Sequence, residues 1–204
     1  MTGRRELQKE RRRAAILEAA ARLFERQGYA ATTFDEIAAA AKVGVATVYK
    51  YFQCKQGIVV ALLQPGVTQV LARAQRVVDR PPADPAAAMV ALLAAYRDLG
   101  GRDWASREIL RLTVYPGIGN EGLLTDLIRD SDSQTQAQIH ALLKSLRGAG
   151  RLKRGLPLAD ATAVIFALLN QHFSMYLADA RLSFAQIFRR LARCVRLVFD
   201  DWRR

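Results

Sequence analysis

The sequence has few cysteines and histidines, the residues that form disulfides or bind metal ions. Its 204 residues include two cysteines, Cys54 and Cys194, and two histidines, His140 and His172. None of the four has a partner at the spacing of a zinc site or of a disulfide framework. A metal, a cofactor and a disulfide are therefore not expected, and this cysteine usage suits a reducing cytosol. A chain of this length can bury a core without such staples.

The sequence also shows no pattern typical of a secretory signal or of a membrane-spanning helix. The residues after Met1, TGRRELQKERRR, are polar and basic, so a secretory signal is not expected. The most apolar stretch, residues 158–178, is interrupted by Asp160 and by three polar side chains. This composition predicts a buried helix and not a membrane span. We therefore expect a cytoplasmic protein without a membrane contact.

No useful stretch alternates apolar and polar residues as a strand does, and the abundant Ala, Leu, Arg, Glu and Gln favour helices. The predicted fold class is all-α, with an N-terminal three-helix domain over residues 1–57 and a larger helical domain over residues 58–204. Glycine and proline clusters separate the expected helices. These helices cover about 10–27, 34–41, 45–52, 55–78 with a bend at Pro65–Gly66, 84–99, 103–114, 120–147, 158–179 and 183–202.

Negative charge is scarce relative to positive charge. The net charge is +12, and residues 1–55 hold 11 basic against 6 acidic residues. Such a surplus indicates a polyanionic partner, either a nucleic acid or an acidic membrane surface.

The first three helices follow a helix-turn-helix plan. Residues 10–27 form an amphipathic helix that Gly28 ends. Thr33 and Glu36 form a capping box at the start of the second helix. The segment KVG is then a tight turn, with Gly44 expected to take a positive φ. In this plan the third helix is presented to the major groove of DNA.

The third helix divides into two faces. Val45, Val48 and Phe52 recur at i, i+3 and i+7 and are expected to face the bundle, while the small and polar side chains face away. Ala46 and the methyl of Thr47 allow close approach to bases, and Lys50 offers a donor. Tyrosine hydroxyls and a lysine at the next helix N-terminus suit phosphates, and the basic arm from Arg4 to Arg13 adds attraction that does not depend on sequence. The residues expected at DNA are Thr33, Val45, Ala46, Thr47, Tyr49, Lys50, Tyr51 and Lys55.

The stretch TTFDEIAAAAKVGVATVYKYFQCK resembles the DNA-binding signature of the tetracycline-repressor (TetR) family. Three positions depart from the family pattern. Lys42 stands where glycine is usual, Gly44 where serine is usual, and Cys54 where serine is usual. The missing serine at position 44 predicts the loss of an N-cap or of a phosphate contact, and Gly44 is expected to supply the flexibility that Lys42 lacks.

The resemblance implies a homodimeric transcriptional regulator, usually a repressor, without catalytic activity. In such a regulator a small-molecule effector binds the C-terminal helical domain and weakens binding to a palindromic operator. The resemblance does not extend specifically beyond about residue 55. From the residue types alone, we expect a pocket lined by large or polar groups on converging helices. The candidates are Tyr96, Trp104, Tyr115, Phe166, Asn170 and Phe173, although each of the aromatics is equally compatible with plain core packing.

A dimer contact is expected at helices 158–179 and 183–202, because both read as apolar over more than one stripe. A partner subunit would cover them in a four-helix bundle. The arginines of the last helix also leave open a membrane or second DNA contact, although a solvated outer face is the simpler interpretation.

Two other functions are compatible with parts of the sequence. A nucleoid-type protein that binds DNA without sequence preference would explain the net charge alone. An all-α enzyme using Cys54 would need a base, which the motif does not place near that residue. Cys54 as a redox switch at a helix N-terminus is a further alternative to a simple serine substitute.

Overall fold

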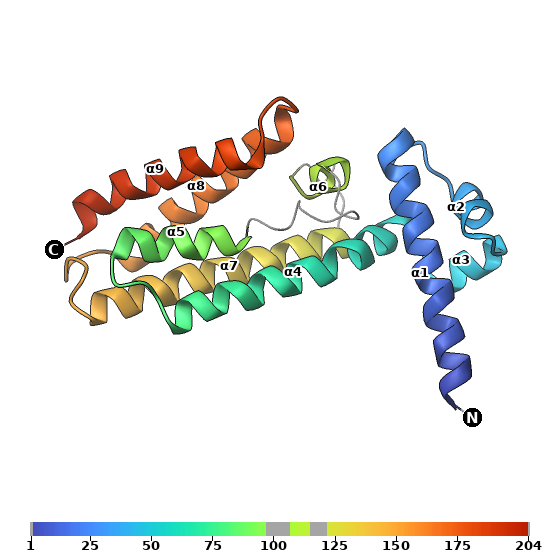
Figure 1. The fold of residues 1–204 in the computed structure, drawn as a ribbon, viewed down its shortest axis with the longest axis horizontal. Coiled ribbons are helices and arrows are strands. Elements are labelled where there is room, and N and C mark those ends of the chain that lie inside the picture. The colour runs from blue at the N-terminus through green and yellow to red at the C-terminus, as the bar shows by residue number, and fades with distance from the viewer. Residues whose placement is uncertain (1, 97–106, 115–121, 204) are drawn as a thin grey trace. The chain divides into compact units, whose positions relative to one another are not determined.

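The computed structural model describes residues 2–96, 107–114 and 122–203, and the regular elements of these residues are helices (Figure 1). One isolated bridge pairs Leu152 with Arg203. The predicted all-α fold class is thereby confirmed. The chain forms two compact units, Met1–Gly66 with Gly100–Ile128, and Val67–Leu99 with Arg129–Arg204. This division falls within two long helices, so a domain boundary at residue 57 stays a prediction.

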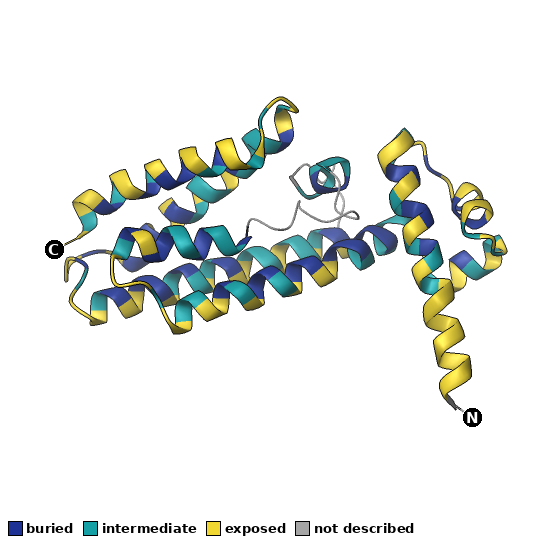
Figure 2. Cartoon of the chain, in the orientation of Figure 1, coloured by how far each residue is buried: buried dark blue, intermediate teal, exposed yellow. Residues whose placement is uncertain are grey.

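The first unit contains α1 (Thr2–Gln27), α2 (Phe34–Ala41), α3 (Val45–Tyr51), the start of α4 (Lys55–Asp79), α6 (Arg107–Val114) and the start of α7 (Leu123–Gly148). Helices α1, α2 and α3 pack around a small core in which Ile16, Phe24, Ile37 and Val48 are fully buried. Helix α1 begins earlier than predicted. Residues 3–12 are exposed and helical (Figure 2), so the basic arm is a helical extension and not an irregular tail.

Helix α2 begins where the sequence predicts, because the capping box forms in full. The backbone N–H of Glu36 donates to Thr33 Oγ1 at 3.3 Å, and the backbone N–H of Thr33 donates to Glu36 Oε2 at 2.8 Å. Two orphan backbone donors of the helix start are thus satisfied by one pair of side chains.

The end of α2 differs from the prediction. Lys42 takes the left-handed conformation, with φ 55° and ψ 43°, whereas Gly44 is extended with φ −72°. The backbone N–H of Val43 donates to Ala38 O at 3.0 Å, which is the long bond of a Schellman motif. The motif needs its positive φ at the residue after the helix. Gly44 lies two residues too late to supply it, and the prediction that it would do so is wrong.

The second unit contains α5 (Pro85–Ala95), α8 (Leu158–Ala178), α9 (Phe184–Trp202) and the remainders of α4 and α7. Helix α5 has Pro85 at its first position and Asp84 as N-cap, whose carboxylate accepts from the N–H of Ala87 at 2.7 Å. Helix α4 continues through Pro65. Helices α4 and α8 reach the length and hydropathy of a membrane span, a criterion that core helices of soluble proteins also meet.

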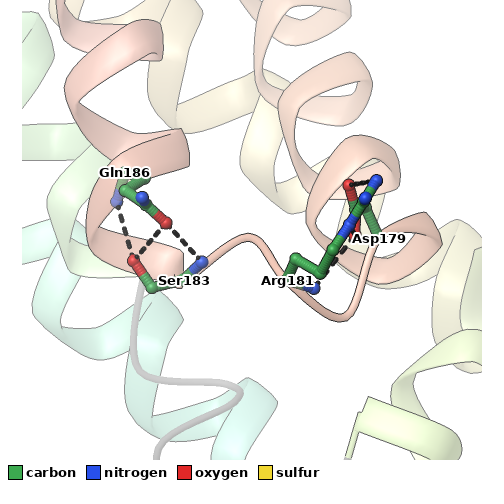
Figure 3. Close-up of polar contacts among 4 residues, drawn as sticks. All are labelled: Asp179, Arg181, Ser183 and Gln186. Carbon is green, nitrogen blue, oxygen red and sulfur yellow. Dashed lines mark hydrogen bonds and ion pairs between the residues drawn. The ribbon is translucent and has the colours of Figure 1, made fainter.

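The turn between α8 and α9 is fixed at both ends (Figure 3). Ser183 and Gln186 form a second capping box, in which the Ser183 N–H donates to Gln186 Oε1 at 2.8 Å. At the other end the Arg181 guanidinium pairs with the carboxylate of Asp179 at 3.0 Å. Helices α8 and α9, which pack against each other, are therefore joined by a short turn with hydrogen bonds at both ends.

The conformation of Lys42 predicts an effect on stability. A residue with a Cβ in the left-handed region costs about 1–2 kcal/mol, of which the greater unfolded-state freedom of glycine offsets a part. We expect Lys42→Gly to raise the free energy of unfolding by about 1 kcal/mol, measured by urea denaturation. The control is Ala39→Gly in the exposed helical part of α2, which should lower it by about 0.5–1 kcal/mol. Equal destabilisation by both changes would contradict the assignment.

Candidate nucleic-acid interface

Helix α3 is held by its inner side chains. Val48 is fully buried and Phe52, directly after the helix, is 5 % exposed. The guanidinium of Arg13 lies over the Phe52 ring at 5.7 Å from its centroid. Val45, the third residue predicted to face the bundle, is half-buried at the first turn. These contacts fix the rotation of α3 about its axis and thereby decide which side chains point outward.

The outward face carries the residue types that the sequence predicts. Ala46 and Lys50 are exposed, and Thr47 is half-buried. The side chain of Tyr49 is 56 % exposed, yet its ring meets Phe34 edge-on at a centroid distance of 4.7 Å. An exposed tyrosine held by an aromatic neighbour presents its hydroxyl with little loss of side-chain entropy.

Tyr51 has a connecting role. Its hydroxyl donates to the carbonyl oxygen of Lys9 at 3.3 Å, and its side chain is half-buried. The bond joins the end of α3 to the exposed extension of α1. Tyr51 thus links the two basic segments of this unit.

Lys55 occupies a different place from the one expected of a phosphate ligand. Its Nζ donates to the carbonyl oxygens of Tyr29 at 2.9 Å, Ala30 at 3.1 Å and Thr32 at 2.9 Å, and it lies 4.7 Å from the centroid of the Tyr29 ring. An ammonium group has three donors, and these three carbonyls use all of them. Lys55 therefore clamps the turn between α1 and α2, a role that the lysine's place at a helix N-terminus does not indicate.

The remaining residues of the same turn support this clamp. Thr33, predicted at DNA, caps α2 as described, and the hydroxyl of the buried Thr32 donates to Gly28 O at 2.8 Å. Gly28 has φ 84° and ends α1 as expected. The pKa of the Tyr29 hydroxyl is raised, mainly by burial and to a smaller extent by the nearby Cys54. The Tyr29 ring that Lys55 contacts therefore stays neutral.

The two other departures from the family pattern have simple local consequences. Gly44 is the N-cap of α3, and no side chain caps the helix there, so the predicted loss of an N-cap is confirmed. The exposed Cys54 precedes α4, and its carbonyl accepts from the N–H of Gly57 at 3.1 Å.

Positive charge dominates the surface around α3. Lys42, Lys50 and the basic side chains of the α1 extension are exposed. Within that extension Lys9 pairs with Glu6 at 4.0 Å, and both side chains are well exposed, so the pair is weak. A face of this composition attracts a polyanion and repels a cationic partner.

The predicted pocket residues lie in several environments. Tyr96 is buried, and its hydroxyl donates to Gln138 Oε1 at 2.7 Å. Burial strongly raises the pKa of this phenol, which keeps it a hydrogen-bond donor. On α8, Phe166 and Phe173 are half-buried and Asn170 is exposed. Trp104 and Tyr115 lie outside the described residues.

Gln138 is the member of this region that the sequence did not single out. Its Nε2 donates to Leu71 O at 2.9 Å and to Gln75 Oε1 at 3.2 Å, so one amide joins α4, α7 and Tyr96. In the sequence, a glutamine that bridges helices in this way cannot be distinguished from a glutamine on the exposed face of an amphipathic helix.

Among the described residues, no group of three or more His, Cys, Asp or Glu side chains could hold a metal ion.

Helices α8 and α9 differ in what they expose. The outward face of α8 is small and almost uncharged, with Ala163, Val164 and Ala167 exposed. Helix α9 buries one apolar stripe and exposes several arginines. Its other exposed side chains are Ala185, Gln186, Asp200, Asp201 and Leu197, of which Leu197 is 73 % exposed. A second apolar stripe on α9 stays a prediction, since Phe184, Phe188 and Val198 are half-buried.

The positions of Lys55 and Lys50 predict different effects of the same substitution on the free energy of unfolding. Lys55→Met leaves three carbonyls without their charged donor and should lower the free energy of unfolding by about 2 kcal/mol in a urea titration. The matched change Lys50→Met removes an exposed ammonium from α3 and should change stability by less than about 0.5 kcal/mol. A Lys55→Met variant as stable as the original chain would show that the clamp does not form in solution.

Known proteins resemble the chain in two ways. Residues 16–62 match the profile of the family described as "Bacterial regulatory proteins, tetR family". The chain is also similar to the uncharacterized HTH-type transcriptional regulator YvkB of Bacillus subtilis (strain 168), with 52 % identity over 48 residues. That alignment covers 24 % of this chain and only 25 % of the relative.

Solved structures extend the likeness to the whole fold. A regulator of the TetR/AcrR family from Thermobifida fusca superposes with a TM-score of 0.69 at 22 % identity, over 90 % of this chain and 96 % of that one. A SmeT–triclosan complex gives 0.72 at 17 % identity, over 95 % and 92 %. FadR from Bacillus subtilis in complex with stearoyl-CoA gives 0.68 at 18 %, over 89 % and 96 %. The likeness to the tetR family thus covers the helix-turn-helix segment of residues 16–62, and the solved structures share the helical fold of most of the chain.

Proposed function

We propose that the chain is a sequence-specific, DNA-binding transcriptional regulator, and that it acts as a repressor released by a small-molecule effector. The observation that carries this proposal is the division of α3. Val48 and Phe52 anchor the helix to the bundle. The side chains of the opposite face project outward, and these are Ala46, Thr47, Tyr49 and Lys50. A seven-residue helix with such an outer face is suited to enter the major groove.

Each outward side chain suits one kind of DNA contact. Ala46 and the Thr47 methyl meet thymine methyl groups, and the Thr47 hydroxyl and Lys50 ammonium bond to base edges or phosphates. Val45, at the first turn of α3, completes the small apolar surface that approaches the bases. The Tyr49 hydroxyl reaches a phosphate and sets the register of the helix. Ala46, Thr47 and Lys50 form the base-reading part of the proposed interface, and Tyr49 positions it.

The residues around α3 supply position and general affinity. The α1 extension carries Arg4, Arg5, Arg11 and Arg12 on an exposed helix, which neutralises phosphates irrespective of sequence. The bond from Tyr51 to Lys9 couples this extension to α3. Thr33 and Lys55 act through the fold, the first as the cap of α2 and the second as the clamp of the α1–α2 turn. This assignment replaces the expectation that both residues contact DNA.

A homodimer follows from the composition of α8. Its exposed alanines and Val164 form an uncharged face that a second copy of the chain can cover. A two-fold axis there would make the contact isologous and the operator palindromic, with half-sites about 34–36 Å or a multiple apart. Helix α9 contributes its neighbouring edge to this bundle and keeps its arginines toward solvent.

The effector is proposed to bind the second unit. Tyr96, Phe166, Asn170 and Phe173 remain candidate lining residues, and the Tyr96–Gln138 bond offers a polar group among apolar ones. SmeT and FadR, which share the fold, are described in complex with triclosan and stearoyl-CoA respectively. An effector here would act by binding the released state better than the DNA-bound state. The proposal assigns no catalytic step to the chain.

Sequence-specific binding can be measured with a duplex that the chain selects from a random DNA library. By fluorescence anisotropy, we expect the selected duplex to bind at least about 10³-fold more tightly than a scrambled one. Lys50→Met should weaken binding to the selected duplex by about ten- to a hundredfold. Equal affinity for both duplexes would instead favour a nucleoid-type protein and would overturn the proposal.

The dimer contact can be tested by placing a charge on α8. Ala167→Glu puts a carboxylate into the proposed interface, where it would lose its hydration without a partner. We expect this variant to sediment as a monomer at concentrations at which the original chain sediments as a dimer. The matched control is Ala72→Glu on the exposed side of α4, which should stay dimeric. A dimer unaffected by Ala167→Glu would place the contact elsewhere.

A further inference from the structure

A cysteine and a histidine face each other where α8 packs on α9. Cys194 Sγ lies 4.0 Å from Nε2 of His172. The histidine is 7 % exposed, whereas the cysteine is half-buried. A reagent in solution can therefore approach the sulfur, with the imidazole behind it, shielded from water. Nothing in the proposed DNA-binding function uses either residue.

The orientation of the imidazole is fixed by its other nitrogen. His172 Nδ1 lies 2.7 Å from the carbonyl oxygen of Leu168, one helical turn earlier. A carbonyl oxygen only accepts hydrogen bonds, so Nδ1 carries the proton of the neutral ring. The lone pair of Nε2 is then directed at Cys194, and among the contacts of the described residues the sulfur is its partner. At 4.0 Å that S–H···N contact is weak, which leaves the lone pair able to accept a proton.

Ionisable side chains lie on the helices around this pair. On α8, Tyr176 lies one turn after His172, and its ring meets that of Phe184 on α9 at a centroid distance of 5.3 Å. His140 of α7 lies with Nδ1 3.3 Å from Thr162 Oγ1 of α8. Helix α5, which also packs on α9, has no ionisable side chain in Pro85–Ala95. On α9 itself, Arg190 lies one turn before Cys194 and Asp201 two turns after it. Asp201 pairs with Lys153 at 3.1 Å.

We propose that Cys194 is a modification site for soft carbon electrophiles of the α,β-unsaturated carbonyl class, with His172 as the base that takes its proton. The sulfur attacks the β-carbon, a C–S bond forms and the C=C π bond breaks. The thiol proton passes to His172 Nε2 and from there to the α-carbon, so the sum is a simple addition without a leaving group or an oxidant. The arrangement of nucleophile, base and orienting carbonyl is the one that activates side-chain nucleophiles generally.

The adduct would have a structural consequence. Cys194 lies at the α8–α9 contact, so a carbonyl compound bound there adds volume beside the buried His172. Well-packed contacts respond to added volume by shifting. The site therefore makes this helix pair responsive to reactive carbonyl compounds, independently of any reversible effector.

The test uses N-ethylmaleimide on the full chain in a Cys54→Ser background, so that one thiol remains. Modification is followed by intact mass spectrometry at pH 7. We expect His172→Phe, which keeps the volume of the ring but removes the base, to slow the modification about tenfold or more. In urea, where the pair is separated, both chains should react equally. An unchanged rate in the folded His172→Phe chain overturns the proposal.

A second measurement needs no change at His172. The rate of an unassisted thiol rises about tenfold with each pH unit up to about pH 8.5. With His172 as base, the rate of the Cys54→Ser chain should level off at a lower pH than the rate of an unassisted thiol. A rate that climbs throughout to pH 8.5 overturns the proposal. DNA binding is not involved in either measurement, so these outcomes are independent of the proposed regulatory function.

Discussion

The proposed function depends on the burial of two side chains, Val48 and Phe52, beneath a helix of seven residues. A helix this short is unstable in water by itself, because the nucleation of its first turn is barely compensated by its few hydrogen bonds. It also lacks a side-chain N-cap, since Gly44 offers none. Its orientation is therefore set mainly by the packing of Val48 and Phe52. The residues proposed to contact DNA are thus positioned by residues that do not contact it, and Lys55, which clamps the α1–α2 turn, belongs to the second group.

Local chemistry made much of the first unit predictable. The capping box at Thr33, the stop at Gly28 and the inner stripe of α3 each involve residues a few positions apart, so spacing alone specifies them. What spacing did not reveal were the contacts across longer distances in the chain. Lys50 and Lys55 are the same residue type five positions apart, and only the fold shows that one faces solvent while the other binds three carbonyls.

The backbone of the turn between α2 and α3 gives a further example. The Schellman motif assigns its positive φ to the residue that follows α2, which in this chain is Lys42. The sequence analysis expected the nearest glycine, Gly44, to supply the positive φ. The hydrogen bonds of the motif, however, require a positive φ at one particular residue, whichever amino acid stands there. In the second unit, the apolar content of α8 and α9 likewise could not show how much of each is covered. The structure separates an uncharged outer face on α8 from an arginine-rich one on α9.

The central claim is that the outward face of α3 touches base edges. The most direct test is methyl NMR of the chain labelled at alanine and threonine, titrated with a duplex that it selects from random DNA. The account predicts that the methyl resonances of Ala46 and Thr47 shift with the selected duplex and much less with a scrambled one, while the methyl of Ala72 stays in place. If the chain binds the selected duplex tightly and the Ala46 and Thr47 methyls do not move, α3 does not read DNA and the account is wrong.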